Sequence, residues 1–372
     1  MLARAAELKP TDATLLSCAT RLRAEFPAPL ANAALETVLL RQRAAVKFSR
    51  AESMFFTREA LEQSTSEIVS RYRAERYTPY VRVADLCCGI GGDTIALAAT
   101  NEVVAVEADP LRLAMAEANV EAYGCRERVT FLQGDVLNTD LPPCDAYFAD
   151  PDRRADGKRH VAIKHYQPSL DSLRERLPRD CPLGVKVAPG VPHREIEALD
   201  AEAEFISLNG ELKECVLWFG PLRTTGRRAT LLPGRDTLFA ERTFDCGVSN
   251  PKAILYDPDP AVVRTGLLAN LGHMLSATLI DAEIAFLTAN TLQATPFATA
   301  YRVDEWHPFG LKLLTKRLRA LHVGRMTVVK RGSAVDADML IRACRLDGPE
   351  HRAVILTRTA GKQIMLIGER ET

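Results

Sequence analysis

The 372-residue sequence lacks several features that would each assign it to a class of protein. It contains no apolar run near the ~20 residues that a membrane-spanning helix needs. Its nine cysteines form no Cys-x-x-Cys pair, so neither a disulfide framework nor a zinc site is predicted. Residues 1–10 mix Ala, Arg and Glu and do not have the pattern of a secretory signal. These absences predict a cytoplasmic protein with reduced thiols and no metal.

The sequence also has no excess charge of either sign, because 48 Lys and Arg residues balance 48 Asp and Glu residues. This balance excludes nucleic-acid binding by bulk basicity, but it does not exclude a local basic patch. The composition, 47% apolar and 26% charged, is ordinary for a globular protein. A length of 372 residues predicts two or three domains.

The hydrophobic pattern changes character along the chain. Residues 1–77 read as helical, and the last of these helices is expected over 58–76. From residue 81 onward, short apolar runs alternate with helical stretches, which predicts a parallel sheet covered on both faces. The predicted strands of this α/β sheet are 83–87, 103–106, 129–132, 145–149, 184–187, 204–208 and 215–219. Asn209-Gly210 predicts a tight hairpin turn between the last two.

A loop rich in Arg, Gly and Pro, residues 221–235, precedes another change of pattern. The remainder reads as a small α+β domain, with helices predicted over 261–275 and 311–321. Its predicted strands are 282–287, 326–330, 353–357 and 363–367. The chain therefore divides into a helical region at 1–77, an α/β domain at 78–222 and a C-terminal domain at 236–372.

The segment with the strongest chemical signal is 83–94, where a buried strand is followed by glycines and then by a helix. Glycines at such a turn allow a ligand to approach the backbone closely. A dinucleotide could place its pyrophosphate there and its ribose on Glu107. A tight turn without any ligand is the structural alternative.

Acidic residues at successive strand ends favour a different ligand. Asp85, Glu107, Asp135 and Asp150 follow or end the first four predicted strands, so they should meet beyond the carboxyl edge of the sheet. A carboxylate beside a pyrophosphate is repulsive, whereas beside a cationic amino-acid ligand it is favourable. Thr94 also stands where a dinucleotide fingerprint has its third glycine. A nicotinamide enzyme is thus the weaker alternative, and a ligand-binding regulator with a decayed site is disfavoured by the intact acid series.

These motifs resemble the class I S-adenosylmethionine-dependent methyltransferases, which have a Rossmann-like sheet. The resemblance implies that Asp85 and the glycine loop hold the methionine part of S-adenosylmethionine, that Glu107 binds the ribose and that Asp135 reaches the adenine. Cofactor contacts are expected from Phe56, Thr57, Asp85, Cys87, Gly89, Gly91, Gly92, Asp93, Thr94, Glu107, Ala108, Gly134, Asp135 and Val136.

Two parts of the chain resemble narrower groups. Residues 55–59, the helix that follows and the loop at 87–94 are similar to the trimethylguanosine synthase branch of RNA methyltransferases. The tail, with motifs at 256–260, 295–297 and 330–332, is similar to bacterial methyltransferases that carry a C-terminal THUMP-like domain. THUMP domains serve RNA-modifying enzymes, so the resemblance implies an RNA substrate.

The segment after the fourth strand departs from the amine-methylating pattern. That pattern has an Asp, Asn or Ser, then Pro-Pro and an aromatic residue, whereas here Asp150-Pro151 is followed by Asp152 and Arg153-Arg154. We expect Asp150, Pro151 and Arg153 to be catalytic. The two arginines suit a phosphate or carboxylate, or else they pair with Asp150, Asp152 or Asp156 and order the loop.

Residues 306–335 carry seven positive charges and no Asp or Glu, in contrast to the balanced whole. A basic helix followed by a basic strand is typical of a surface that binds a phosphate backbone, although many charged runs are only solvated faces. The predicted RNA contacts are Lys312, Lys316, Arg317, Arg319, Lys330 and Arg331. The alternative is a methyltransferase for a small molecule or protein, whose tail is a packing or dimerisation module.

Overall fold

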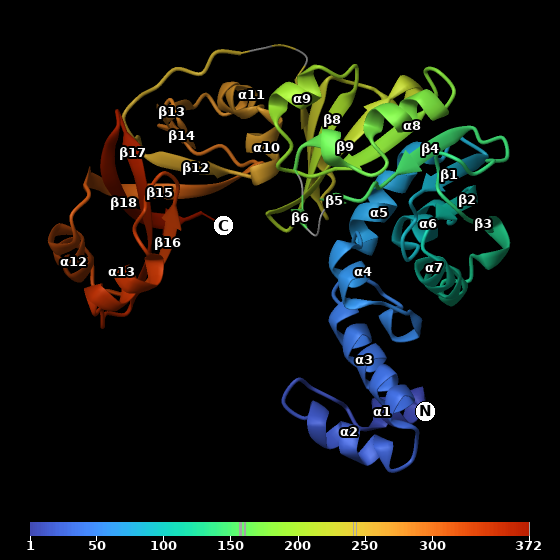
Figure 1. Cartoon of the computed structure of the whole chain (residues 1–372). Coiled ribbons are helices and arrows are strands. Elements are labelled where there is room, and N and C mark those ends of the chain that lie inside the picture. The colour runs from blue at the N-terminus through green and yellow to red at the C-terminus, as the bar shows by residue number, and fades with distance from the viewer. Residues whose placement is uncertain (156–157, 160, 241, 243, 372) are drawn as a thin grey trace. The chain divides into compact units, whose positions relative to one another are not determined.

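The computed structural model describes residues 1–155, 158–159, 161–240, 242 and 244–371 (Figure 1). The chain forms two compact units. The first contains residues 1–203 and 214–224, and the second contains residues 204–213 and 225–372. The first unit thus joins the N-terminal helices to most of the α/β sheet, while the three-part division made from sequence pattern stays a prediction.

The first unit is built on a sheet whose strands run in the order β3-β2-β1-β4-β7-β9. All neighbours are parallel except β9, which is antiparallel to β7. The strands are β1 (Arg82–Leu86), β2 (Glu102–Glu107), β3 (Val129–Gln133), β4 (Ala146–Ala149), β7 (Leu183–Val187) and β9 (Glu211–Phe219). Strand order reverses between β1 and β4, which is where ligands bind in open α/β sheets.

Helices connect and cover these strands, as Figure 1 shows for α6 and α7 beside β1, β2 and β3. Asp109 caps α7 by accepting hydrogen bonds from the backbone N–H groups of Leu111 and Arg112, and Pro110 is the first residue of the helix. The helices of this unit are α1 (Leu2–Glu7), α2 (Leu15–Arg23), α3 (Ala28–Ala44), α4 (Arg58–Gln63), α5 (Glu67–Ala74), α6 (Gly92–Leu97), α7 (Pro110–Ala122), α8 (Leu170–Arg176) and α9 (His193–Glu197). The two short strands β5 (Arg154–Ala155) and β6 (Lys158–Arg159) pair antiparallel with each other.

The prediction of a single helix over 58–76 is wrong, because the segment forms two helices, α4 and α5, that are separated by a break at residues 64–66. Serine and threonine favour caps over helix interiors, and Ser66 takes the extended conformation of an N-cap before α5. Lys47 stabilises the break, since its Nζ donates to the backbone carbonyls of Leu61 (2.7 Å) and Ser64 (2.9 Å). The end of α4 leaves such carbonyls without helical partners, and the hydroxyl of Ser64 also donates to that of Leu61 (2.9 Å).

The second unit contains a mixed seven-stranded sheet of order β13-β14-β12-β15-β18-β17-β16, together with the strands β8, β10 and β11. Its strands are β8 (Glu202–Leu208), β10 (Arg227–Leu232), β11 (Asp236–Phe239), β12 (Ile254–Pro258), β13 (Thr278–Asp281), β14 (Ile284–Ala289), β15 (Ala298–Pro308), β16 (Val323–Lys330), β17 (Glu350–Thr359) and β18 (Lys362–Arg370). Its helices are α10 (Pro260–Thr265), α11 (Leu268–Met274), α12 (Leu311–Ala320) and α13 (Ala337–Cys344).

Each face of the seven-stranded sheet has its own core. Leu314, Leu318 and Leu340 from α12 and α13 pack on one face, against Val354 and Met365. Ile280, Phe286 and Tyr301 belong to the opposite cluster. The predicted α+β character of this domain is therefore confirmed.

Several elements of the second unit differ from the sequence-based expectations. The helix expected over 261–275 is two helices, because Gly266 ends α10 in the left-handed conformation with φ of 77°. The loop expected over 221–235 contains a strand, β10. No counterpart among the predicted elements exists for β11, β12, β13, β15 and α13. Asn209 and Gly210 do form the expected turn, with φ of 53° and 78°.

Within the described residues, we find no helix that combines the length and the apolar character needed to cross a membrane.

Candidate active site

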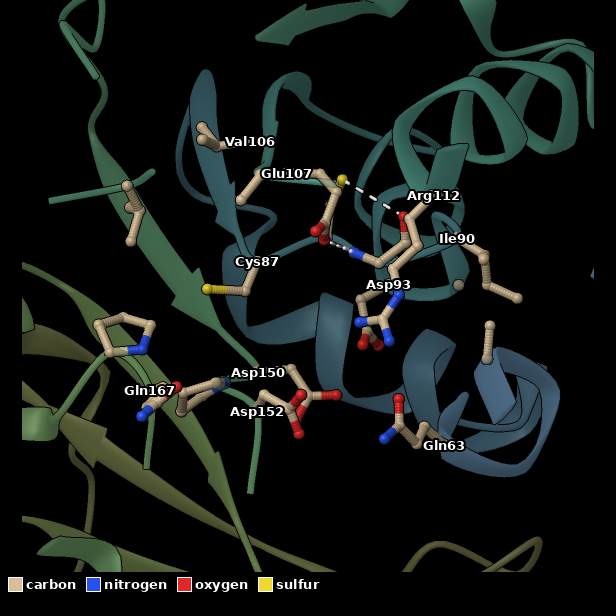
Figure 2. Close-up of a pocket in the computed structure, with 18 of the residues that line it drawn as sticks. Gln63, Cys87, Ile90, Asp93, Val106, Glu107, Arg112, Asp150, Asp152 and Gln167 are labelled. Atoms are coloured by element: carbon tan, nitrogen blue, oxygen red, sulfur yellow. Dashed lines mark hydrogen bonds between the residues drawn. The ribbon is translucent and has the colours of Figure 1, made fainter. Parts of the chain in front are cut away.

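A cavity of about 560 Å³ lies in the first unit at the carboxyl ends of β1, β2, β3 and β4 (Figure 2). Its wall includes most of the predicted site residues, which come from segments far apart in the sequence. These are Cys87, Gly89, Gly92, Asp93, Glu107, Ala108, Gly134, Asp135, Val136, Asp150, Pro151 and Arg153. The volume lies within the range of small-molecule sites.

The glycine loop has a backbone that other residues adopt only with strain. Gly89 and Gly91 have φ of 57° and 83°, and Cys87 has φ of 64°. A Cβ atom on Gly91 would come within 3.2–3.3 Å of Ala116 in α7, so this glycine allows the close contact between α6 and α7. A Cβ on Gly89 would meet nothing within 4 Å, which leaves its side of the loop open.

Glu107 at the end of β2 is the anchor of this loop. One carboxylate oxygen, Oε2, accepts a hydrogen bond from the backbone N–H of Gly89 (2.8 Å), and Oε1 accepts one from Asp109 (3.0 Å). Figure 2 shows this carboxylate beside the loop and directed into the cavity. Each oxygen keeps a second lone pair, so the buried Glu107 can still accept two hydroxyl hydrogen bonds from a ligand.

Asp85 lies behind the cavity instead of in its wall. The side chain is buried, and the hydroxyl of Thr94 donates to its Oδ2 (2.5 Å). Its Oδ1 is buried without a hydrogen-bond partner among the described residues. Burial and the nearby Asp93 carboxylate raise the pKa of Asp85 well above its usual value. The carboxylate that the loop presents to the cavity is Asp93.

A network of buried charges supports this wall. Arg73 of α5 pairs with both Asp93 and Glu214 and lies over the ring of Phe148, with 4.4 Å from its guanidinium carbon to the ring centroid. Lys186 of β7 donates from Nζ to Asp150 Oδ2 (2.6 Å).

Lys186 Nζ also donates to the hydroxyl of Thr65 (2.8 Å). Across the whole network two cations face four acids, namely Asp85, Asp93, Asp150 and Glu214. The excess of acids favours a cationic ligand over a pyrophosphate.

The mouth of the cavity is the segment after β4. Asp150, Pro151 and Arg153 line it, and Asp152 exchanges backbone hydrogen bonds with Gln167 (2.9 and 3.0 Å). The Asp150 carboxylate pairs with Lys186, a partner that the sequence-based pairing with Arg153 or Arg154 did not include. Asp156 lies outside the described residues.

The structure does not bring Phe56, Thr57, Gly91 or Thr94 to the cavity wall. Phe56 is buried against Phe48, with ring centroids 5.8 Å apart. The hydroxyl of Thr57 caps α4 by accepting from the N–H of Ala60 (3.1 Å).

Residues just C-terminal to this cap, in α4 and in the break that follows it, take the expected place of Phe56 and Thr57 in the cavity wall. This part of the wall consists of Ala60, Glu62, Gln63, Ser64 and Thr65.

Sequence reasoning also missed Lys186, Arg73, Arg112 and Gln167. Arg112 and Gln167 line the cavity, whereas the other two act behind it. The sequence does carry a signal for Lys186, because a lysine within the apolar run of β7 needs a charged or polar partner when it is buried. Arg73 and Gln167 lie in ordinary polar stretches that carry no such signal.

The thiols of the loop are poorly suited to act as nucleophiles. Burial and the surrounding carboxylates, Glu107 first, raise the pKa of Cys87 far above its usual value, and burial has the same effect on Cys88. Among the residues that the structure describes, no group of three or more His, Cys, Asp or Glu side chains could hold a metal ion.

The predicted RNA-contact residues of the second unit divide into two sets. Lys312, Lys316, Arg319 and Lys330 are exposed, and the ammonium of Lys330 donates to the carbonyl of Val335 (3.1 Å).

Arg317 and Arg331 instead have acidic partners from outside the basic segment. Arg317 forms a two-pronged ion pair with Glu305 (2.6–2.9 Å), and Arg331 pairs with Asp257 (2.8 Å). These two cations are largely neutralised by their partners.

The cavity fits S-adenosylmethionine on three counts. The glycine loop is open at Gly89, the wall contains more acidic than basic side chains, and Glu107 in the wall keeps free lone pairs for hydroxyl groups. Cationic sulfur and ammonium groups would complement this charge, whereas the two negative charges of a dinucleotide pyrophosphate would not.

Comparison with known proteins agrees with this chemistry. A Mycobacterium tuberculosis protein, described as an uncharacterized S-adenosylmethionine-dependent methyltransferase, is 36% identical over 342 residues, which cover 87% of this chain and 92% of the relative. The chain belongs to the S-adenosylmethionine-dependent methyltransferases, and S-adenosylmethionine is its cofactor.

More local similarities follow the division of the chain. The family profile of RNA cap guanine-N2 methyltransferases matches residues 81–177, that of THUMP-like domains matches 298–370, and a domain family of unknown function matches 1–44. Trimethylguanosine synthase of Schizosaccharomyces pombe is 48% identical over 58 residues, 15% of this chain and 24% of that protein.

A solved structure from Porphyromonas gingivalis W83, described as a candidate methyltransferase, has a TM-score of 0.78 at 19% identity over 93% of this chain and 92% of that chain. This likeness confirms the Rossmann-like methyltransferase fold.

Proposed function

We propose that this methyltransferase acts on RNA and transfers the methyl group to a nitrogen of a base, including an exocyclic amine. Two similarities support RNA as the acceptor, namely the cap guanine-N2 methyltransferase profile over 81–177 and the THUMP-like profile over 298–370. Free thiols at all nine cysteines support a cytoplasmic location.

The acids around the cavity would hold the cofactor by its polar groups. Glu107 has two free lone pairs for the ribose hydroxyls, and Asp135 lies in the wall at the end of β3, where an adenine amine would reach it. Asp93 presents its carboxylate to the methionine end, and Asp85 supports the loop from behind through Thr94. Phe56 and Thr57 fix the fold of the preceding segment instead of touching the ligand.

The observation that carries the proposed reaction is the position of Asp150. Its Oδ2 is held by Lys186 at 2.6 Å, while the carboxylate remains in the cavity wall. The other oxygen is then directed to accept a hydrogen bond from the N–H of an acceptor amine, which orients the nitrogen lone pair. When bound, S-adenosylmethionine supplies a methyl group on a cationic sulfur that such a nitrogen attacks in line.

The exposed cations Lys312, Lys316, Arg319 and Lys330 would contact RNA phosphates without reading sequence. Arg317 and Arg331 have structural roles, because each already has a carboxylate partner. The proposed RNA footprint is therefore smaller than the basic segment suggests.

The acceptor class can be tested with S-adenosylmethionine labelled in the methyl group. Purified protein is incubated with the RNA, protein and small-molecule fractions of cells that lack it, and the label in each fraction is counted. We expect label in RNA alone, in a nucleoside that mass spectrometry finds depleted in the RNA of the mutant cells. Label confined to protein or to small molecules would overturn the proposal.

The role of Asp150 is tested by Asp150→Asn, which keeps an acceptor for Lys186 but removes the negative charge near the amine. We expect kcat to fall roughly 100-fold, equivalent to about 2.7 kcal/mol of transition-state stabilisation. Affinity for S-adenosylhomocysteine, measured by calorimetry, should stay within about twofold, since Asp150 serves the acceptor. A variant with normal kcat and weakened cofactor binding would show that Asp150 belongs to the cofactor site.

A further inference from the structure

The second unit contains a cavity of about 580 Å³ whose wall is basic. It lies between the edge strand β16, the adjacent β17 and the end of α13. Its charged and titratable lining residues are Arg325, Arg342, Arg345 and His351, and none of the residues in its wall is acidic. Only Arg325 belongs to the basic segment that the sequence analysis identified, so the fold assembles this group from three separate segments.

The three guanidinium groups have no ion-pair partner within the described part of the chain. Other arginines of the second unit do have one. Arg317 pairs with Glu305, and Arg352 pairs with Asp304 at 3.2 Å. The three side chains are exposed, so water screens their mutual repulsion, but together they create a positive potential in the cavity that attracts an anion.

The helix dipole explains only part of this cluster. Arg342 lies in the last turn of α13 and Arg345 is its C-cap, where cations are favourable. Arg325 and His351, however, come from β16 and β17, where they are paired across the strands. Arg345 also has φ of 46°, a left-handed conformation that favours glycine at this position. An arginine there has a conformational cost that the helix end alone does not require.

We propose that this cavity binds a phosphodiester group of the RNA substrate, an inference that rests on RNA as the acceptor. Guanidinium groups donate two parallel hydrogen bonds to phosphate oxygens, and several of them around one concavity hold a phosphate more firmly than a flat basic surface does. Ile341 and Leu346 in the same wall provide apolar surface for the adjacent ribose or base. The site supplies affinity and position, because phosphate contacts carry no sequence information.

The test compares RNA binding by the full-length protein and by the pocket variant Arg325→Gln/Arg342→Gln/Arg345→Gln, in filter assays over a salt series with total cellular RNA. We expect the variant to lose at least roughly tenfold in affinity at about 0.1 M salt, and the slope of log K against log salt to fall by about one, as the loss of one phosphate contact requires. Affinity for S-adenosylhomocysteine should be unchanged, which also shows that the methyltransferase domain is folded.

A matched control removes the same charge from exposed positions of the first unit, as Lys9→Gln/Arg21→Gln/Arg179→Gln. We expect this control to lose less than about threefold, because it reduces only the overall field. The single change Arg342→Glu provides a second variant if the triple change lowers expression, and it should bind RNA more weakly than wild type.

Each remaining outcome has a definite meaning. Equal losses in the pocket variant and the control, or full RNA affinity in the pocket variant and in Arg342→Glu, would overturn the phosphate site and leave the proposed function standing. A wild-type protein that neither binds nor methylates RNA would overturn the proposed function itself.

Discussion

Replacing Lys186 with methionine tests how the reacting edge of the sheet is held. Its side chain is 6% exposed, and its Nζ lies 2.6 Å from Asp150 Oδ2, whose own side chain is 26% exposed. At this distance the Coulomb attraction is about 6 kcal/mol for an effective dielectric constant of roughly 20, and desolvation offsets much of it. Removing one partner of a buried pair costs about 3–5 kcal/mol.

The lower end of that range applies here, because Asp150 retains access to water. A loss of about 3 kcal/mol would lower the melting temperature of the first unit by roughly 6–12 °C. The freed Asp150 carboxylate should also lose its orientation toward the acceptor. We therefore expect kcat to fall roughly 100-fold in Lys186→Met, with nearly unchanged affinity for S-adenosylhomocysteine.

Three measurements separate this positioning role from a general loss of structure: melting temperature, calorimetric cofactor affinity, and kcat at a temperature well below the melting point. Lys186→Gln keeps a donor for Asp150 and should recover part of kcat. If Lys186→Met remains folded and turns over at the wild-type rate, the ion pair has no part in orienting Asp150. If both variants bind the cofactor poorly, the pair supports the cofactor site instead.

Two further changes test the cofactor side of the cavity. Glu107→Ala removes the acceptor of two ribose hydrogen bonds and the anchor of Gly89. Calorimetry should therefore show that S-adenosylhomocysteine binding is weakened by at least about 3 kcal/mol, roughly 150-fold. Wild-type affinity in this variant would exclude Glu107 from the cofactor site. Because burial raises the pKa of Asp85, its contribution to stability is present below the unfolded pKa of about 3.9 and is lost as pH rises through the folded value. Asp85→Asn should thus gain melting temperature over wild type as pH rises above about 4, and parallel melting curves across pH would contradict the shift.

Local sequence determined the α/β sheet, the glycine loop and the series of acids at the strand ends. Each depends on residues that are near one another in the chain. These are the apolar run that forms a strand, the glycine that allows a positive φ, and the acid at or just after the end of a strand. Because parallel strands end at one edge of a sheet, the sequence alone suffices to place Glu107, Asp135 and Asp150 together. Their shared wall confirms that placement.

Tertiary structure decided which charges meet. Lys186 holds Asp150 across 36 residues of sequence, and Arg73 holds Glu214 across 141. The same long-range pairing joins Arg331 to Asp257 and so removes a cation from the expected RNA surface. Composition of the segment 306–335 could not show this, because its neutralising acids lie outside it.

The break after α4 and the basic cavity beside α13 both depend on contacts between residues that are far apart in the sequence. Ser64 and Thr65 end a helix whose apolar pattern continues, because Lys47 and the sheet provide partners that the isolated segment lacks. Arg342 and Arg345 lie in a stretch for which the sequence predicted no element, and only the fold brings Arg325 of β16 beside them. Periodicity and capping act over a few residues and are visible in the sequence, whereas the pairing of buried charges depends on distances that only the folded chain sets.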